Sequence, residues 1–268
     1  MISRRTAICL AVIGLSATGL IGSASAQDYP TRPVKWVVGY PPGGATDIIA
    51  RLLGQRLSER LGQQFVIENK PGAGNNIATE SVINAEPDGY TLLFVNPASY
   101  INATLYANLK FNVIRDIAPI AAFNRVPNVM TVNNNVPAKT VAEFIAYVKA
   151  NPGKVNYGSS GVGTSIHLAA ELFKIATGTR MTYVPYRSSN EIMQNLTGGH
   201  IDLAFDNITL AWPQAKAGTV RALGVTSPQR SPTAPEVPPI ADTLKGFDAT
   251  SWHGLFAPSG TPRPAVDK

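Results

Sequence analysis

Short apolar runs alternate along this chain with segments in which apolar residues recur every three or four positions. Residues 34–39 form a nearly continuous apolar run, which predicts a buried strand, and residues 65–67 predict a second one. Between them, the apolar residues of 47–61 recur with helical spacing, and Gly62 stands where a helix commonly ends. By the same reasoning we predict strands at 90–95, 155–157, 181–184, 201–205, 220–225 and 252–257, and helices at 77–85, 141–149 and 166–175.

The repeated order of strand, loop and helix predicts an α/β protein with a parallel sheet. Residues 117–132 interrupt this order with two near-continuous apolar runs, after which it begins again. Two such units in series predict two lobes that face a cleft, and ligands of such sheets lie beyond the carboxyl ends of the strands. We place lobe I at 27–124 plus 251–268 and lobe II at 125–250, with crossings near 124–127 and 247–251.

Each unit contains a glycine-rich loop between a predicted strand and a predicted helix. The first loop reads Tyr40-Pro41-Pro42-Gly43-Gly44-Ala45-Thr46-Asp47. The second reads Tyr157-Gly158-Ser159-Ser160-Gly161-Val162-Gly163-Thr164-Ser165. A helix start leaves backbone N–H groups without partners at the positive end of the helix dipole, where anions bind. Two such loops on different lobes predict an anion held from two sides.

Side chains outside the glycines add candidate chemistry. Asp47 stands in the first turn of a predicted helix, where a carboxylate either stabilises the dipole or receives a ligand amine or hydroxyl. Asp206, followed by Asn207, ends a predicted strand and therefore faces the cleft. Tyr186 follows another strand and offers an apolar wall with a hydroxyl, or ordinary packing.

The charge of the chain suits a small anionic ligand better than a nucleic acid. Lysine and arginine number 23 against 17 acidic residues, a formal net charge of +6. The basic residues are scattered rather than clustered into a stripe, which argues against nucleic-acid binding. A mild positive balance is compatible with an anionic ligand.

Residues 1–26 are typical of a cleaved signal peptide. Arg4 and Arg5 precede an apolar stretch at 7–21, and Ala24-Ser25-Ala26 forms a small-residue cleavage site. Cleavage after Ala26 would leave a periplasmic chain with a charge of 6 − 2 = +4. An uncleaved anchor is the alternative, and general and twin-arginine export both stay open. The only cysteine, Cys9, lies inside this segment, so the mature chain would contain no thiol or disulfide.

The sequence predicts neither a metal site nor a cofactor, and it argues against catalysis. His167, His200 and His253 are far apart and lack the spacing of metal ligands. The second loop has the order G-x-x-G-x-G and no lysine, which disfavours nucleotide binding. Ser159 or Ser165, with His167 and Asp206, could form a hydrolase triad on paper. The G-x-S-x-G motif of such enzymes is missing, so we expect no catalytic residues.

Several motifs together resemble the Bug-type substrate-binding proteins of tripartite tricarboxylate transporters. The resemblance covers essentially all of 28–264. Its motifs are the run from Tyr29-Pro30 through Trp36, Pro41-Pro42-Gly43-Gly44-x-x-Asp47, Glu68-Asn69-Lys70-Pro71-Gly72-Ala73-Gly74, Pro87-Asp88-Gly89-Tyr90-Thr91-Leu92-Leu93, Tyr157-Gly158-Ser159 to His167-Leu168, Val184-Pro185-Tyr186 and Gly198 to Asp202.

This resemblance implies a periplasmic, two-lobed "Venus flytrap" of the type II binding-protein class. Such proteins capture small organic acids, from mono- to tricarboxylates, and deliver them to a transporter with two integral membrane subunits. The loops matching 43–47 and 159–165 would hold one carboxylate through N–H groups, hydroxyls and water, and the residues around Asp206 would select the rest of the ligand. The chain departs from the family pattern at Tyr40 and at Ala45-Thr46, which leaves the ligand open.

The resemblance also implies a chain that continues beyond Lys268 into a carboxy-terminal helical segment on lobe I, so we expect the sequence to be truncated. We expect a monomer. Two alternatives remain: a secreted α/β hydrolase, and a ligand sensor for a membrane kinase. The predicted ligand-binding residues are Tyr40, Gly43, Gly44, Ala45, Thr46, Asp47, Ser159, Ser160, Gly161, Gly163, Thr164, Ser165, His167, Tyr186, Asp206 and Asn207.

Overall fold

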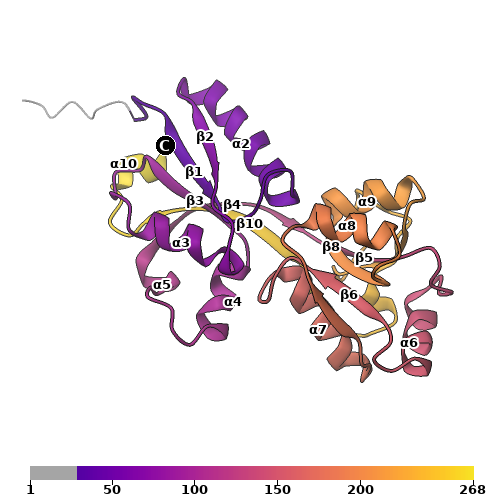
Figure 1. Ribbon diagram of the computed structural model, residues 1–268. Coiled ribbons are helices and arrows are strands. Elements are labelled where there is room, and N and C mark those ends of the chain that lie inside the picture. Colours follow the sequence, from indigo (N-terminus) through magenta and orange to yellow (C-terminus); the bar gives the residue numbers. More distant parts are fainter. Residues whose placement is uncertain (1–28) are drawn as a thin grey trace, which may run out of the picture.

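The computed structural model describes residues 29–268, which form two lobes joined by a pair of long, extended segments (Figure 1). Each lobe is built around its own five-stranded sheet. The predicted signal peptide, residues 1–26, lies outside the described residues. Across residues 29–268, none of the helices combines the length and the apolar character that crossing a membrane requires.

Lobe I has a sheet with helices on both faces and the strand order β2-β1-β3-β10-β4. The strands β2, β1 and β3 are parallel, whereas β10 is antiparallel to both β3 and β4. Its elements are β1 (Val34–Val38), α2 (Ala45–Leu61), β2 (Phe65–Asn69), η1 (Ala73–Asn75), α3 (Asn76–Ile83), β3 (Thr91–Val95), α4 (Ala98–Leu105), α5 (Val113–Asp116), β4 (Ile117–Val126), β10 (Ser251–Pro258) and α10 (Arg263–Asp267).

The core of lobe I explains why apolar residues in β1 do not alternate with polar ones. Trp36 belongs to the cluster beneath α2, where its ring stacks on Phe94 at 5.8 Å. Val37 points the other way, into the cluster beneath α3 that contains Ala78 and Val82. A strand that is buried on both faces needs apolar residues at successive positions.

Lobe II repeats this arrangement with the strand order β7-β6-β8-β5-β9. Here β5 is antiparallel to its neighbours β8 and β9, and β6 is parallel to β7 and β8. The elements are β5 (Asn128–Val132), α6 (Val141–Ala150), β6 (Asn156–Ser159), α7 (Ser165–Thr177), β7 (Thr182–Pro185), α8 (Ser189–Thr197), β8 (Leu203–Asn207), α9 (Ile208–Lys216), β9 (Arg221–Val225) and η2 (Ile240–Asp242).

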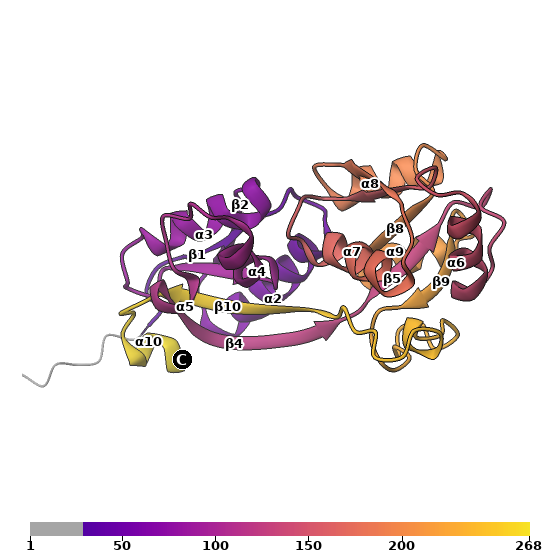
Figure 2. The same ribbon diagram turned by 90° about the horizontal axis from the view of Figure 1, so that it is seen from below.

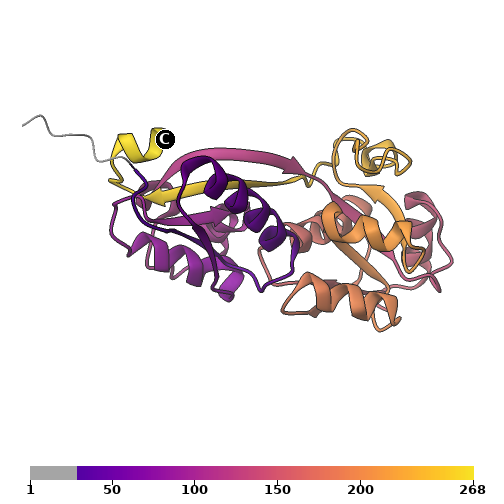
Figure 3. The ribbon, with the colours of Figure 1, turned by 90° about the horizontal axis from the view of Figure 1, so that it is seen from above.

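The chain passes between the lobes twice along neighbouring strands. Only Pro127 separates β4 of lobe I from β5 of lobe II. On the return, Phe247 still packs in the core of lobe II, and β10 then begins at Ser251, whose register partner is Val126 at the end of β4. Figures 2 and 3 show β4 and β10 lying side by side, with β4 leading toward lobe II and β10 leading back into lobe I.

The predicted strands and helices are confirmed. The predicted parallel pairing is observed among β1, β2 and β3 and among β6, β7 and β8, whereas β10 and β5 add antiparallel pairs that were not predicted. Parallel strands need a crossover connection within one lobe. β4 leaves lobe I and β10 returns to it, so the two strands run in opposite directions. The helices α4, α5, α8 and α9 were not predicted from the sequence. For α8 a signal was present, because Ser188 and Glu191 have the spacing of a capping box, and the Ser188 hydroxyl accepts the N–H of Glu191 at 3.3 Å.

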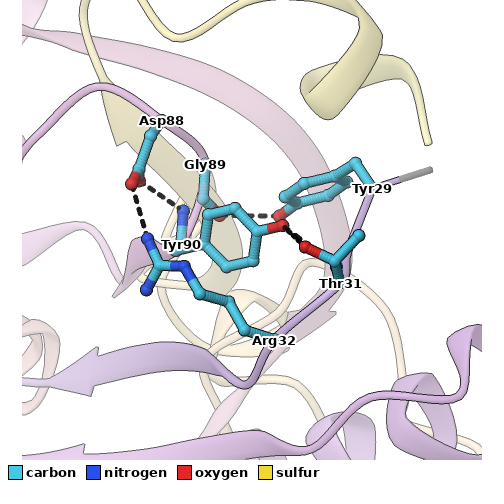
Figure 4. A network of polar contacts seen from close by, with 6 residues as sticks. All are labelled: Tyr29, Thr31, Arg32, Asp88, Gly89 and Tyr90. Carbon is cyan, nitrogen blue, oxygen red and sulfur yellow. Dashed lines mark hydrogen bonds and ion pairs between the residues drawn. The ribbon is translucent and has the colours of Figure 1, made fainter. Parts of the chain in front are cut away.

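Two motifs of the resemblance meet far from the predicted ligand loops and fasten the start of the described chain to lobe I (Figure 4). The hydroxyl of Tyr29 donates to the carbonyl of Gly89 at 2.6 Å. The Arg32 guanidinium lies 3.9 Å from the centre of the Tyr90 ring and pairs with Asp88 at 2.7 Å. These motifs therefore stabilise the fold rather than bind a ligand.

Candidate functional site

A cavity lies between the lobes, at the place where both glycine-rich loops open onto their helices. It contains about 510 Å³ of space free of protein atoms, including open solvent at its mouth. Its lining residues are Tyr40, Pro41, Gly44, Ala45, Thr46, Asn96, Asn128, Ser160, Thr164, Ser165, Ile166, Ser188, Ser189, Asp206, Asn207, Ser251 and His253.

The amino-terminal turn of α2 forms the wall from lobe I. Gly44 is the cap of this helix, and the first N–H inside the helix to find an acceptor is that of Ile48, which donates to the Gly44 carbonyl at 3.0 Å. Within residues 29–268, the N–H groups of Ala45, Thr46 and Asp47 have no acceptor. The cavity therefore meets the positive end of a seventeen-residue helix.

Asp47 braces the first loop and does not line the cavity. Its carboxylate accepts hydrogen bonds from the Gly43 N–H, the Arg51 guanidinium and the Asn69 amide, each at 2.9 Å. Burial by itself would raise the pKa of Asp47, but the bonds from Arg51, Gly43 and Asn69 outweigh it and hold the pKa below its ordinary value. We considered two uses for Asp47, stabilising the helix start and contacting a ligand. These hydrogen bonds correspond to the first use.

The amino-terminal turn of α7 forms the facing wall from lobe II. Thr164 caps this helix, because its hydroxyl accepts the N–H of His167 at 3.3 Å and donates to the carbonyl of Gly161 at 2.7 Å. Ser160 and Ser165 flank the cap and line the cavity with it. This wall presents hydroxyl groups and a helix start to the same space as α2.

Two more helices of lobe II begin at the cavity. Ser188 caps α8, and Ser189 is its first residue. Asn207 caps α9, because its amide oxygen accepts the N–H of Thr209 at 3.2 Å. Helix starts therefore surround the cavity, and each contributes a positive partial charge. Ser188 and Ser189 are cavity residues that were not predicted from the sequence, because α8 was not predicted.

Asp206 is fully buried in the cavity wall at the carboxyl end of β8. One carboxylate oxygen, Oδ1, accepts the N–H of Asn207 at 2.7 Å and the hydroxyl of Ser189 at 2.9 Å. The other, Oδ2, has no hydrogen-bond partner among the residues that the structure describes. Burial raises the pKa of Asp206 to about 6, against the lowering effect of the two donors.

His253 in β10 links the first loop to the neighbouring strand β4. Its backbone N–H and its Nδ1 lie 3.2 and 3.0 Å from Oδ1 of Asn124 in β4. Because an amide oxygen can only accept, Nδ1 of the ring donates its N–H to Asn124. Nε2 then has no hydrogen and accepts the hydroxyl of Thr46 at 3.4 Å. Burial lowers the pKa of His253 to about 4, so the ring is neutral at pH 7.

Tyr40 closes the lobe I side of the cavity. Its hydroxyl accepts the amide N–H of Asn96 at 2.9 Å, and burial raises its pKa to about 12. Asn96 lines the cavity, and its amide oxygen accepts the N–H of Ala98, the first residue of α4, at 3.0 Å. A neutral phenol with a fixed hydroxyl therefore borders the space.

The cavity brings together nine of the sixteen predicted residues: Tyr40, Gly44, Ala45, Thr46, Ser160, Thr164, Ser165, Asp206 and Asn207. Besides Asp47, the residues Gly43, Ser159, Gly161, Gly163, His167 and Tyr186 do not line it. His167 instead packs its ring edge-on against Tyr183 at 5.0 Å, and burial lowers the pKa of its imidazole. The ring of Tyr186 lies against Gly158, where an added Cβ would come within 3.0 Å of it.

Gly43 and Gly163 stand where the two lobes touch. A Cβ added to Gly43 would lie 3.2 Å from Nδ2 of Asn190 in lobe II. A Cβ added to Gly163 would lie only 2.5 Å from Oδ1 of Asn102 and 2.8 Å from Cδ2 of Leu105, both in α4 of lobe I. These glycines let the lobes approach around the cavity rather than forming its wall.

The chemistry of the lining is that of a polar site without strong cations. No lysine or arginine lines the cavity, as far as residues 29–268 extend. In the same part of the chain, no three histidine, cysteine, aspartate or glutamate side chains gather as a metal site would require. An anion in this cavity would therefore be held by N–H groups, hydroxyls and helix dipoles.

Comparison with known proteins agrees with this arrangement. Residues 49–268 match the model of the family described as "Tripartite tricarboxylate transporter family receptor". A UPF0065 protein of Pseudomonas sp. (strain P51) is 38% identical over 97% of this chain and 78% of its own length. The protein BugT of Bordetella pertussis is 34% identical over 94% of this chain and 79% of its own.

Solved structures show the same fold. The periplasmic binding protein BugD superposes with a TM-score of 0.85 at 36% identity, over 89% of this chain and 80% of that one. A protein of R. palustris with adipate superposes with a TM-score of 0.85 at 38% identity, over 89% of this chain and 81% of that one. MatC of Rhodopseudomonas palustris, with bound malate, superposes with a TM-score of 0.83 at 33% identity, over 89% of this chain and 82% of that one.

These matches confirm the resemblance that the motifs indicated and the two-lobed fold of periplasmic binding proteins. Family and structural neighbours are solute-binding proteins, and the receptors of this family work with the membrane subunits of a tripartite transporter. The chain therefore belongs to the tripartite tricarboxylate transporter receptor family and is a solute receptor.

Proposed function

We propose that the cavity binds a small organic acid and that the amino-terminal turns of α2 and α7 hold one of its carboxylates. The observation that carries this proposal is the pair of helix starts that open into one cavity from opposite lobes. Backbone N–H groups at a helix start favour an anion by their partial charge and by direct hydrogen bonds. The predicted ligand residues that line the cavity are our candidates for this contact.

Two neighbours with bound acids support the proposal. One was solved with adipate and another with malate, and both share at least 33% of their residues with this chain. Because the departures at Tyr40 and Ala45-Thr46 fall on the cavity wall, we do not transfer either acid to this protein. We transfer only the class, a small organic acid.

We also propose that the protein does not catalyse a reaction on this ligand. The cavity contains Ser165 and Asp206, but His167 lies outside it against Tyr183. The histidine inside the cavity, His253, contacts Thr46 and Asn124 rather than a serine. These contacts do not support the hydrolase alternative, which requires a serine, a histidine and a carboxylate in one hydrogen-bonded chain.

The remaining proposals concern the protein as a whole. Export with cleavage after Ala26 would place a monomer in the periplasm, where it would bind its acid by closing lobe I on lobe II. The hinges would be the predicted crossings near 124–127 and 247–251, and the short link at Pro127 supports this position. The closed receptor would then deliver the acid to the membrane subunits of its transporter. Mass spectrometry of the exported protein tests the cleavage site, and light scattering tests the monomer.

A thermal-shift screen against small mono-, di- and tricarboxylates tests the binding proposal. A ligand that binds only the folded protein raises its melting temperature, by an amount that grows with concentration. We expect such a shift with at least one acid and none with the matching neutral amide. If no carboxylate shifts the melting temperature at millimolar concentration, the proposal is wrong.

A further inference from the structure

The two lobes also meet outside the cavity, where α4 of lobe I contacts the second glycine-rich loop. A Cβ added to Gly163 would come within 2.5 Å of Oδ1 of Asn102, so this oxygen lies against the backbone of the loop. Figure 2 shows α4 on the side of lobe I that faces α7. Neither Asn102 nor Gly163 lines the cavity. The contact is therefore separate from the space in which we place the ligand.

Asn102 presents to this contact an amide oxygen that lobe I does not pair. The side chain is fully buried. Its Nδ2 donates to the Gly74 carbonyl at 2.7 Å and to Oδ1 of Asn76 at 2.8 Å, and these two bonds fix the amide group. Its Oδ1 has no donor among the residues that the structure describes. Because a buried acceptor without a donor is unfavourable, a donor from the facing lobe would stabilise the contact.

The second loop has such a donor at the same place. Within residues 29–268, the N–H group of Gly163 has no acceptor. The carbonyl oxygen of the preceding residue, Val162, accepts no hydrogen bond in this part of the chain either. Since Gly163 has no side chain, its backbone is open to Oδ1 of Asn102. The loop therefore offers one free donor and one free acceptor to lobe I.

The loop that precedes α3 has the matching pair in lobe I. A Cβ added to Gly74 would lie 3.1 Å from the carbonyl oxygen of Val162, so the two backbones approach closely. The N–H group of Gly74 has no acceptor in the described chain. Lobe I thus brings a donor at Gly74 and an acceptor at Asn102. Each stands beside its counterpart in the second loop.

Lobe I holds the loop around Gly74 in an uncommon backbone conformation. Residues 72–75 all have positive φ, between 47° and 133°, and two of them, Ala73 and Asn75, are not glycine. Such residues are strained and persist only where their surroundings impose the conformation. The Nδ2 of Asn75 donates to the Ser99 hydroxyl at 2.5 Å, which ties the loop to α4. The position of Gly74 is therefore fixed by lobe I itself.

We infer that these four residues form a latch between the lobes of the ligand-bound receptor. In this latch the Gly163 N–H donates to Oδ1 of Asn102, and the Gly74 N–H donates to the Val162 carbonyl. The inference rests on the proposed function, because the latch closes on a receptor that holds a carboxylate at the start of α7. It assigns a role in binding to residues that do not touch the ligand.

The second loop couples the latch to the cavity. Ser160 and Thr164 line the cavity, and Val162 and Gly163 lie between them in the chain. A carboxylate that fixes Ser160 and Thr164 also fixes the two latch residues, and by reciprocity a closed latch strengthens binding of the carboxylate. Since no latch residue lines the cavity, the latch acts on every acid alike. It determines how long an acid stays bound rather than which acid binds.

The substitution Gly74→Ala tests the latch, with Gly62→Ala as its matched control. In the first variant the added Cβ pushes the Val162 carbonyl away from the Gly74 N–H. Gly62 has a similar φ, 71° against 59°, and belongs to the same lobe, but a Cβ there would meet nothing within 4 Å. Both variants therefore strain the free protein in the same way.

The probes are succinate, malate, adipate and citrate, mixed with the whole chain in a stopped-flow fluorimeter to give kon and koff. We expect Gly74→Ala to raise koff by about fivefold for every acid that binds, the effect of one ordinary hydrogen bond. We expect kon to change less than about twofold, and the order of affinities to stay the same, because the latch forms after capture. Gly62→Ala should leave koff unchanged.

Asn102→Ala removes the acceptor oxygen of the latch and should raise koff in the same way, again without a change in the order of affinities. Equal koff values for Gly74→Ala and Gly62→Ala would overturn the latch and leave the carboxylate site standing. A change confined to kon, or one that differs from acid to acid, would overturn it as well. If the wild-type protein binds none of the four acids, both the binding proposal and the latch are wrong. The comparison of the two glycine variants decides the matter even if Asn102→Ala does not fold.

Discussion

The contact between Gly163 and α4 offers a way to block closure of the lobes without touching the cavity lining. Gly163 lies at the tip of the second loop with φ +86°, a conformation that glycine adopts without strain. The substitution Gly163→Ala places a Cβ against Asn102 and Leu105 of the opposite lobe. We expect the variant to fold, to bind its ligand more weakly and to keep its choice of ligand.

The magnitude follows from what the added methyl group meets. It would lie 2.5 Å from Oδ1 of Asn102 and 2.8 Å from Cδ2 of Leu105, well inside van der Waals contact. Asn102 is not free to move, because its Nδ2 donates to the Gly74 carbonyl at 2.7 Å and to Oδ1 of Asn76 at 2.8 Å. Overpacking of this kind costs about 1–3 kcal/mol, which corresponds to roughly a 5- to 150-fold rise in Kd.

Gly153→Ala is the matched control. Gly153 has φ +75° and also belongs to lobe II, but an added Cβ there would meet nothing within 4 Å. Both variants therefore impose the same kind of backbone strain, and both should lower the melting temperature of the free protein. Only Gly163→Ala should raise Kd in calorimetry. Equal Kd values for the two variants would refute the idea that this contact forms in the closed, ligand-bound receptor.

Three further changes test the site. Asp47→Asn removes the charge that pairs with the Arg51 guanidinium, and we expect a loss of about 2 kcal/mol in urea unfolding; an unchanged midpoint would contradict the bracing role. Gly44→Pro suits the local φ of −77° and removes one N–H, so binding should weaken about tenfold with little loss of stability, and unchanged binding would exclude that N–H as a ligand contact. His253→Gln tests how stability depends on pH. The pKa of His253 falls from 6.5 to about 4 on folding, so the unfolded chain takes up a proton more readily than the folded protein in this window. The free energy of unfolding of the wild type therefore decreases by about 3 kcal/mol in total as the pH falls from 6.5 to 4. The free energy of unfolding should therefore rise less steeply from pH 4 to 6.5 in the variant than in the wild type, and equal slopes in urea titrations would reject the buried neutral histidine.

Local information was enough for the elements and for the two loops. The helix predicted at 47–61 is observed as α2, Ala45–Leu61, and it ends at Gly62 with φ 71° as predicted. The loops were found because a small-residue segment between a strand and a helix can be read from neighbouring residues alone. The periodicity did not reveal α8, where a capping box was the signal, or the reversed direction of β10, which depends on a passage through the other lobe.

The sequence by itself determined the alternation of strands and helices, the position of both helix starts and the family, because each depends on residues close together in the chain. Only the tertiary structure decided which side chains share the cavity. Thr46 and His253 are 207 positions apart and meet only because β10 returns beside the first lobe's sheet. Asn128, Ser189 and Asp206 belong to three separate elements of lobe II, and they come together in the cavity wall because β5 begins where β8 ends and α8 begins there too. Whether a polar atom is left without a partner depends on all of its neighbours, and the fold alone supplies them.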